Sequence, residues 1–248
     1  MKNLLENIGK KSKKAFFQKL SSKKKDKVLR DYCYLINKNK KLIINENKKD
    51  IKIALKKKIK INLIQRLILN DKKISDIIDS IKKIIKLKDP TNVILEKWKR
   101  PNGLNISKIS IPIGVIGVIY ESRPNVTSDI ASLCFKSGNT VILKGGSEAL
   151  YSNLILSKLF RKSLKKNNVD ENFVQFINLK KRKVVDYLLT NMNNFIDIII
   201  PRGGKNLVKK VQDLSTVPTI GHLEGICHSY VDKDANPKTA NKIIYNAK

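Results

Sequence analysis

IGVIGVIYESRPNVTSDIASLCFKSGNTVILKGGSE, the stretch from Ile113 to Glu148, decides the fold of this chain. Its continuous apolar run over Ile113–Tyr120 predicts a strand that is buried on both faces. A helix is expected over Thr127–Ser137, ending at Gly138, and a second strand over Thr140–Leu143. Strand, helix and strand in this order predict a parallel α/β unit, with ligand-facing loops at the strand ends.

The same alternation continues toward the C-terminus. Strands are expected over Phe173–Ile177, Phe195–Ile200, Val217–Ile220 and Ser229–Val231, and helices over Ser147–Lys166, Lys181–Thr190, 205–213 and Pro237–Lys248. Repeated βα units with short connections indicate a parallel sheet.

The N-terminal side is lysine-rich and helical in pattern. Helices are expected over Asp26–Asn39, Lys49–Lys60, Leu63–Leu69 and Ile74–Leu87. Ser75 and Asp76 suit the start of the last of these helices, and Pro90 ends it because proline pushes the residue before it out of the α region. We therefore expect an N-terminal helical region, 1–104, followed by a Rossmann-like domain, 105–248.

The formal net charge of +31 suggests a nucleic-acid-binding protein at first sight. The excess is almost all lysine, since arginine occurs only at positions 30, 66, 100, 123, 161, 182 and 202. Lysine, isoleucine and asparagine share codons rich in A and T, so the charge is typical of an A+T-rich genome. Nucleic-acid recognition favours arginine and aromatic side chains, and aromatic residues make up only 6% of the chain. Specific nucleic-acid binding is therefore the disfavoured alternative, although weak, salt-sensitive binding to polyanions is expected.

No apolar run reaches the ~18–20 residues that a membrane-spanning helix needs. The N-terminus, MKNLLENIGKKSKK, lacks the apolar region of a secretory signal, so we expect a cytoplasmic protein with no membrane contact. The three cysteines, Cys33, Cys134 and Cys227, are far apart and odd in number, which predicts reduced thiols. A zinc site at His222, Cys227 and His228 is not expected, since no second ligand pair is present.

Two loops after predicted strands carry residues that suit anions. Arg123 is expected to bind a phosphate or carboxylate through its planar fork, with Ser122 assisting; the alternative is an ion pair between Arg123 and Glu121. The turn Arg202–Gly203–Gly204 opens a helix, whose free N–H groups suit a pyrophosphate. The alternative for this turn is a tight strand-to-helix connection.

Four segments carry a resemblance to a known family: YESRPNVT (120–127), LKGGSEA (143–149), IPRGGK (200–205) and GHLEGICHSYVDKDAN (221–236). Together they resemble γ-glutamyl phosphate reductase, also called glutamate-5-semialdehyde dehydrogenase, of the aldehyde dehydrogenase superfamily. The resemblance runs from about Ile44 to Lys248, and several ordered motifs are far more specific than one glycine motif. It implies an aldehyde-dehydrogenase-like, Rossmann-type parallel sheet behind the N-terminal helices.

The resemblance implies NADPH-dependent reduction of L-glutamyl 5-phosphate to L-glutamate 5-semialdehyde, with release of phosphate, in proline biosynthesis. In the family a cysteine thiolate attacks the acyl phosphate, and the resulting thioester accepts a hydride. Asn125 matches the donor that stabilises the oxyanion. The alternative is that Asn125 caps a helix that begins near Thr127.

The cofactor residues follow from the same resemblance. Lys144 matches the superfamily lysine that reaches the adenosine ribose, and Ser147 stands where enzymes that prefer NAD often carry an acid. A small neutral residue beside a lysine leaves room for a 2′-phosphate, so NADP(H) is expected rather than NAD. Gly145 and Gly146 permit close backbone approach, or form a plain turn.

The chain departs from the family at its C-terminus. The family's nucleophilic cysteine lies a few residues beyond the segment that matches Tyr245–Lys248, so the C-terminal catalytic domain is expected to be missing, and none of the three cysteines replaces it. The general base falls by register on Gly221, with Glu224 three residues later, so no base is assigned. A homo-oligomer or a complementing C-terminal piece is expected to be needed. An inactive NADP-binding remnant remains the second interpretation.

Overall fold

The centre of the molecule is a parallel sheet of four strands. The computed structural model describes residues 1–121, 123–181, 183–221 and 227–247. The strands are β3 (Val115–Tyr120), β4 (Thr140–Gly145), β5 (Val174–Phe176) and β6 (Ile198–Arg202), in the spatial order β5-β4-β3-β6. Every pair of neighbours is parallel. The predicted α/β fold with a parallel sheet is therefore confirmed, and the strands lie within or close to the expected ranges.

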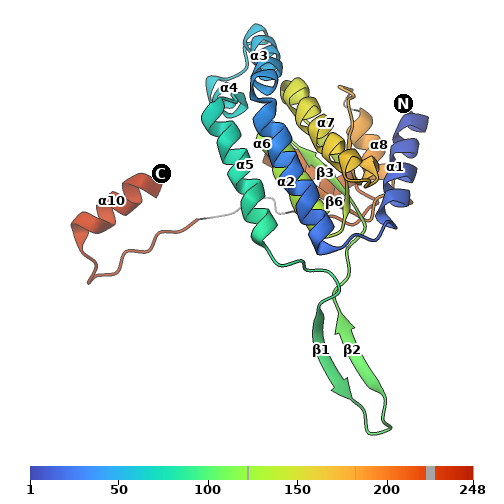
Figure 1. Cartoon of the computed structure of the whole chain (residues 1–248). Helices are drawn as coiled ribbons and strands as arrows, with labels where there is room; N and C mark the ends of the chain where they lie inside the picture. The colour runs from blue at the N-terminus through green and yellow to red at the C-terminus, as the bar shows by residue number, and fades with distance from the viewer. Residues whose placement is uncertain (122, 182, 222–226, 248) are drawn as a thin grey trace.

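Helices cover both faces of this sheet (Figure 1). Because successive side chains of a strand point to opposite faces, alternate residues of β3 enter two different apolar clusters. Ile116 and Val118 pack in the cluster that contains α2, α5, α6 and α7. Val115 and Ile119 pack in the cluster that contains α1, α8 and α9. The helices are α1 (Lys2–Phe16), α2 (Ser22–Lys38), α3 (Lys40–Lys56), α4 (Ile61–Leu67), α5 (Asp71–Lys86), α6 (Pro124–Lys136), α7 (Leu150–Lys166), α8 (Lys183–Asn191), α9 (Lys205–Leu214) and α10 (Pro237–Ala247), with short 3₁₀ turns η1 (Ser147–Ala149) and η2 (Glu171–Phe173).

The N-terminal helices are built by the expected apolar periodicity. Helix α5 carries isoleucines three and four residues apart, of which five are buried and Ile85 is partly buried. The predicted helix start at Ser75 and Asp76 is wrong, because Asn70 caps α5 by accepting a hydrogen bond from the Lys73 N–H at 2.9 Å. Since α2 and α5 share one core with β3 and β4, the N-terminal helices are packed onto the sheet. The division at residue 104 stays a prediction.

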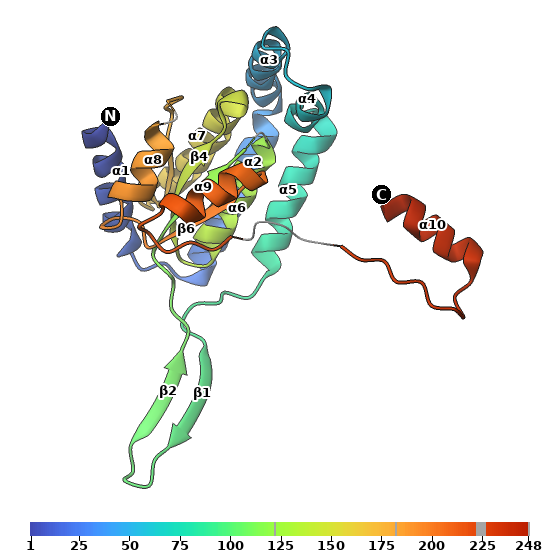
Figure 2. The same ribbon diagram turned by 180° about the vertical axis from the view of Figure 1, so that it is seen from behind.

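An antiparallel hairpin that the sequence analysis did not predict joins α5 to the sheet. Its strands are β1 (Ile94–Lys99) and β2 (Asn105–Ile109), and every residue of β1 is exposed. Gly103, in the connecting turn, has a φ of +88°, a conformation that glycine adopts without strain. Figures 1 and 2 show the hairpin projecting away from the helices and the sheet.

The C-terminal segment has less regular structure than predicted. The expected strand over Val217–Ile220 is reduced to one isolated parallel bridge between Ile199 and Thr219. The expected strand over Ser229–Val231 is not formed, and these residues are exposed. Helix α10 is present but buries none of its residues, and both views show it apart from the sheet (Figure 2). Within the described ranges, no helix has the length and apolar character needed to cross a membrane.

Candidate functional site

The ends of three neighbouring strands bring three sequence motifs to one edge of the sheet. In the parallel register, Tyr120 at the end of β3 lies beside Gly145 of β4 on one side and beside Arg202 of β6 on the other. The loops that follow these strands therefore meet at the carboxyl edge, with the β3 loop in the middle. Ligands in open α/β sheets bind at this edge.

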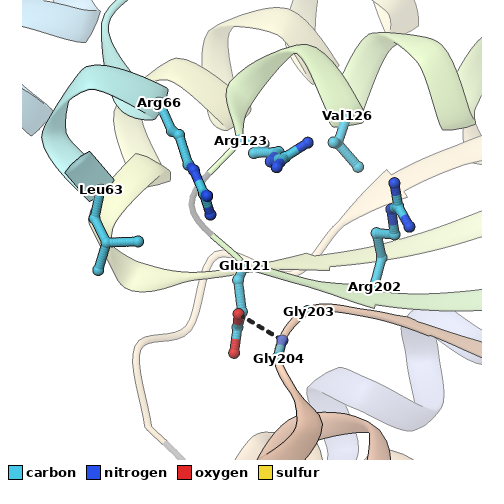
Figure 3. Close-up of a pocket in the computed structure, with 8 residues that line it drawn as sticks. All are labelled: Leu63, Arg66, Glu121, Arg123, Val126, Arg202, Gly203 and Gly204. Carbon is cyan, nitrogen blue, oxygen red and sulfur yellow. Dashed lines mark hydrogen bonds between the residues drawn. The ribbon is translucent and has the colours of Figure 1, made fainter. Parts of the chain in front are cut away.

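A cavity of about 300 Å³ lies at this edge (Figure 3). Its lining residues are Leu63, Arg66, Glu121, Arg123, Val126, Arg202, Gly203 and Gly204. Three of the chain's seven arginines line it, and each comes from a different element. Arg66 lies on α4, Arg123 is the residue that precedes α6, and Arg202 ends β6. The predicted anion residues Arg123 and Arg202–Gly204 are thus brought together.

Glu121 links the β3 loop to the start of α9. Its Oε2 atom accepts a hydrogen bond from the backbone N–H of Gly204 at 3.0 Å (Figure 3). Its own N–H donates to the carbonyl of Arg202 at 3.2 Å. A Cβ atom on Gly203 would lie 2.7 Å from the Glu121 Cδ atom, so the lack of a side chain there lets the glutamate approach. One of the N–H groups expected to bind a pyrophosphate is therefore already bonded to a carboxylate.

The alternative interpretation of Arg123, an ion pair with Glu121, is wrong. In the part of the chain that the structure describes, no ion pair involves Glu121 or the guanidinium groups of Arg66, Arg123 and Arg202. Figure 3 shows the three arginine side chains on one side of the cavity and the Glu121 carboxylate turned toward Gly204. The cavity thus has unneutralised positive charge that attracts anions.

Asn125 lies in the first turn of α6, because the helix begins at Pro124 rather than near Thr127. It does not cap the helix. Its Nδ2 atom donates to Oδ2 of Asp129 at 3.2 Å. Burial raises the pKa of Asp129, although hydrogen bonds from Ser80 and Asn125 oppose that shift. A second cavity of about 320 Å³ is lined by Leu69, Lys73, Asp76, Ile77 and Ser80, and by Arg66, Asn125 and Asp129.

The predicted cofactor residues after β4 do not line the arginine cavity. Lys144 is buried, and its ammonium group donates to the carbonyl of Gly145 at 2.8 Å. Burial lowers the pKa of Lys144, and the nearby Glu148 carboxylate partly opposes this. The Ser147 hydroxyl donates to the carboxylate of Glu148 at 3.0 Å. Gly146 precedes the 3₁₀ turn η1.

Gly145 has a packing role that the sequence did not reveal. A Cβ atom on this residue would collide with the Asn153 amide and with the ring of Tyr120. The glycine is therefore required by the neighbouring side chains, whether or not a ligand approaches its backbone.

Other predicted positions are placed as follows. Ser122, His222 and Glu224 lie outside the described residues. Cys227 and His228 are exposed, and no cluster of three or more candidate metal ligands occurs within the described ranges. Cys33 and Cys134 are buried, and burial raises the pKa of their thiols to about 11 and about 12, respectively. These two thiols are thus packing residues, as predicted.

Sequence reasoning missed two members of the site. Arg66 lies on a short helix far from the motifs, and only its being an arginine in a lysine-rich chain distinguishes it. Glu121 was considered only as a partner for Arg123, since the contact with α9 depends on the pairing of β3 with β6.

Comparisons with known proteins agree on one group of relatives. No model of a known protein family matches the chain. The γ-glutamyl phosphate reductase of Thermodesulfovibrio yellowstonii is 40% identical over 250 residues, which cover 100% of this chain and 60% of the relative. The crystal structure of γ-glutamyl phosphate reductase from Thermotoga maritima matches with a TM-score of 0.92 and 37% identity, over 98% of this chain and 59% of that one.

A more distant structure shows the wider fold. An acetylating aldehyde dehydrogenase from Geobacillus thermoglucosidasius matches with a TM-score of 0.68 and 15% identity, over 88% of this chain and 45% of that one. At that identity the likeness concerns the fold alone. The chain spans 44 to 60% of the length of the curated relatives that it matches.

Proposed function

Since this chain is homologous in sequence and fold to the γ-glutamyl phosphate reductases, we propose that it forms the cofactor-binding and substrate-binding part of such an enzyme. The reaction is the reduction of L-glutamyl 5-phosphate by NADPH to L-glutamate 5-semialdehyde, with release of phosphate, in proline biosynthesis. Because the chain spans only part of its relatives, the complete reaction is a proposal for this protein.

One observation supports an anionic substrate best. Arg66, Arg123 and Arg202 line one cavity at the carboxyl edge of the sheet, and none of them forms an ion pair within the described residues. A guanidinium group presents a planar pair of donors that matches carboxylate and phosphate groups. We assign Arg123 to the substrate, with Arg66 as a second candidate. Ser122, which precedes Arg123 in the sequence, is kept as a proposed substrate residue.

Asn125 is the proposed oxyanion donor. An amide N–H is neutral and can be aimed at charge that develops on the attacked carbonyl oxygen. One N–H of Asn125 is directed toward Asp129, which restricts the rotation of the amide group, and the second N–H points elsewhere. Loss of such a donor costs about 10²–10³ in kcat in enzymes that rely on it.

The proposed cofactor is NADP(H), whose nicotinamide supplies the hydride. The exposed turn of Gly203 and Gly204 at the start of α9, with Arg202 beside it, is the proposed place for a phosphate group. A bound phosphate would replace Glu121 as the acceptor of the Gly204 N–H. Lys144, Gly145, Gly146 and Ser147 follow β4 at the same edge of the sheet. We assign these four residues to the adenosine ribose and its 2′-phosphate.

The nucleophilic thiol is proposed to come from outside these 248 residues. A nucleophilic cysteine needs a low pKa, whereas burial raises the pKa of both Cys33 and Cys134. Cys227 is exposed and is not among the residues that line the arginine cavity. Activity is therefore expected to require a complementing segment that supplies the thiol, acting in the cytoplasm. A homo-oligomer is proposed as the alternative way in which the protein assembles.

The reverse reaction tests the proposal with stable reagents. Glutamate 5-semialdehyde, phosphate and NADP⁺ should yield NADPH, followed by its absorbance, when the chain is supplied with the rest of its reductase. NADPH binding to the 248-residue chain, followed by fluorescence, is measured in parallel. Binding without turnover in the complemented protein would favour the inactive remnant, and failure of both would refute the proposal.

A further inference from the structure

Asn125 and Asp129 lie one turn apart on the same face of α6. The Nδ2 atom of Asn125 donates to Oδ2 of Asp129 at 3.2 Å. An ionised carboxylate only accepts hydrogen bonds, whereas an amide has a donor end and an acceptor end. Asp129 therefore selects the donor end of the Asn125 amide, and it leaves the second N–H of that amide directed away from itself.

The surroundings of Asp129 are unfavourable for a carboxylate that serves only the fold. Its Oδ1 atom is buried and, among the residues that the structure describes, has no hydrogen-bond partner. Burial raises the pKa of Asp129, although hydrogen bonds from Ser80 and Asn125 oppose that shift. Since a buried polar atom without a partner is destabilising, an apolar side chain of similar shape would suit the packing of α5 against α6 equally well.

The Asn125 amide and the Asp129 carboxylate line the second cavity, of about 320 Å³. The other charged side chains of this lining are Arg66 on α4 and Lys73 and Asp76 on α5. Arg66 also lines the arginine cavity, so the two cavities are neighbours. A volume of this size admits a small ligand, and the direction of the amide therefore matters for whatever enters.

We propose that Asp129 is a positioning residue, which holds the Asn125 amide with one N–H toward itself so that the other N–H meets the oxyanion. The inference rests on the proposed role of Asn125 and adds a residue that acts through it. A donor that is already aimed needs no reorientation when charge develops in the transition state. A small misplacement of such a group is costly in rate.

Two variants separate this hydrogen bond from the fold, in the chain supplied with the rest of its reductase. Asp129→Leu keeps a similar shape but removes the acceptor, and it should lower kcat of the reverse reaction about ten- to hundredfold. The KM for the semialdehyde should change by less than about threefold, because ground-state binding is untouched. Asp129→Asn retains a carbonyl acceptor and should restore most of kcat. Asp213→Asn, at an exposed carboxylate on α9, is the control for the lost charge.

Stability distinguishes a positioning role from a structural one. Because Oδ1 of Asp129 has no partner among the described residues, Asp129→Leu should be at least as stable as the wild type in urea denaturation. A structural carboxylate would lose stability and kcat together. That parallel loss, or a raised KM with an unchanged kcat, would overturn the inference.

Asn125→Ala shows whether Asp129 acts through Asn125. Alone it should lower kcat by about 10²–10³. In the Asn125→Ala background, Asp129→Leu should cause no further loss, because the group that it positions is gone. An equal loss in both backgrounds would contradict the inference.

The outcomes separate the inference from the proposed function. Turnover that depends on Asn125 but not on Asp129 refutes only this inference. Turnover that is independent of Asn125 refutes the oxyanion assignment and the inference with it. Absence of turnover in the complemented wild type refutes the proposed reaction itself, on which the inference rests.

Discussion

The hydroxyl groups of Tyr120 and Thr127 lie 2.6 Å apart and join the end of β3 to the first turns of α6. Thr127 in turn donates to the side-chain oxygen of Asn153 on α7 at 2.9 Å, so Tyr120 donates to Thr127. All three side chains are buried. The chain of hydrogen bonds holds the end of β3 and the start of α6, the helix that Arg123 precedes and that bears Asn125, in fixed relation.

Removal of this contact tests how firmly the loop is held. Tyr120→Phe should lower the free energy of unfolding by about 1 kcal/mol, the net value of a typical hydrogen bond. Thr127→Val should cost more, because it also leaves Asn153 without its donor. Urea denaturation measures both, and Tyr245→Phe, at a side chain that is 89% exposed, is the neutral control. A Tyr120→Phe protein as stable as the wild type would show that the hydrogen bond contributes nothing.

The ion pair between Lys25 and Asp89 predicts the behaviour in acid. Lys25 is buried, and its Nζ lies 2.5 Å from Oδ2 of Asp89. Burial by itself raises the pKa of Asp89, but the hydrogen bonds from Lys25 and Thr91 outweigh it, so the pKa lies below its ordinary 3.8. Because the pKa is lower in the folded state, the unfolded state binds the proton at a higher pH than the folded state as the pH falls. The stabilisation is therefore complete above pH 3.8 and is lost as the pH falls through the lower value of the folded state.

Asp89→Asn should therefore lose about 2–4 kcal/mol near neutral pH, because it leaves a buried ammonium without its charge partner. The loss should shrink as the pH falls from 3.8 through the lower folded-state pKa of Asp89, below which the wild-type carboxylate is itself protonated. Asp79→Asn, which breaks an exposed pair with Lys82, should cost less than about 1 kcal/mol. Urea denaturation across pH tests this, and a loss for Asp89→Asn that is independent of pH would contradict it.

The contact between Glu121 and α9 predicts a coupling between two neighbouring positions. A Cβ atom on Gly203 would lie 2.7 Å from Glu121 Cδ and 2.8 Å from Leu207 Cδ2. Gly203→Ala should therefore displace the Glu121 side chain and cost about 1 kcal/mol, the net value of its hydrogen bond from the Gly204 N–H. In a Glu121→Ala background the cost should fall by about 1 kcal/mol, because one of the two colliding groups is gone. Gly204→Ala is the control, since its nearest neighbour would be 3.8 Å away. Additive effects of Gly203→Ala and Glu121→Ala would count against the contact.

The sequence alone predicted the elements whose residues are buried in the core. Strands β3 and β4 are buried along their whole length. Their short, continuous apolar runs therefore predict buried strands. The hairpin β1–β2 was missed because nearly all of its residues are exposed. Without a buried face, its sequence shows no alternation of apolar and polar residues that would predict a strand. The strand expected over Ser229–Val231 failed for the same reason, since an exposed segment has no packing partner to impose a strand.

The candidate site was predictable where loops follow strands and not where helices supply side chains. Arg123 and Arg202 lie directly after or at the end of paired strands, so the parallel register brings them to one edge. Arg66 reaches the same cavity only through the packing of α4, whose apolar contacts with Ala149 no local pattern specifies. The bond between Glu121 and Gly204 also depends on tertiary structure.

A single substitution at Ser147 tests the proposed preference for NADPH over NADH. Ser147→Glu restores an acid at the position where it would hold the ribose hydroxyls and repel a 2′-phosphate. It should lower the affinity for NADPH by about tenfold or more while leaving that for NADH unchanged or improved. Ser147 is half-buried and donates a hydrogen bond to Glu148, so a glutamate there could also disturb the turn. Ser229→Glu, at an exposed serine, is the control for the added negative charge alone. Fluorescence titration with the two nucleotides measures the ratio. An equal loss for both would indicate a disturbed turn after β4, and unchanged affinities for both would refute the assignment of Ser147 to the 2′-phosphate.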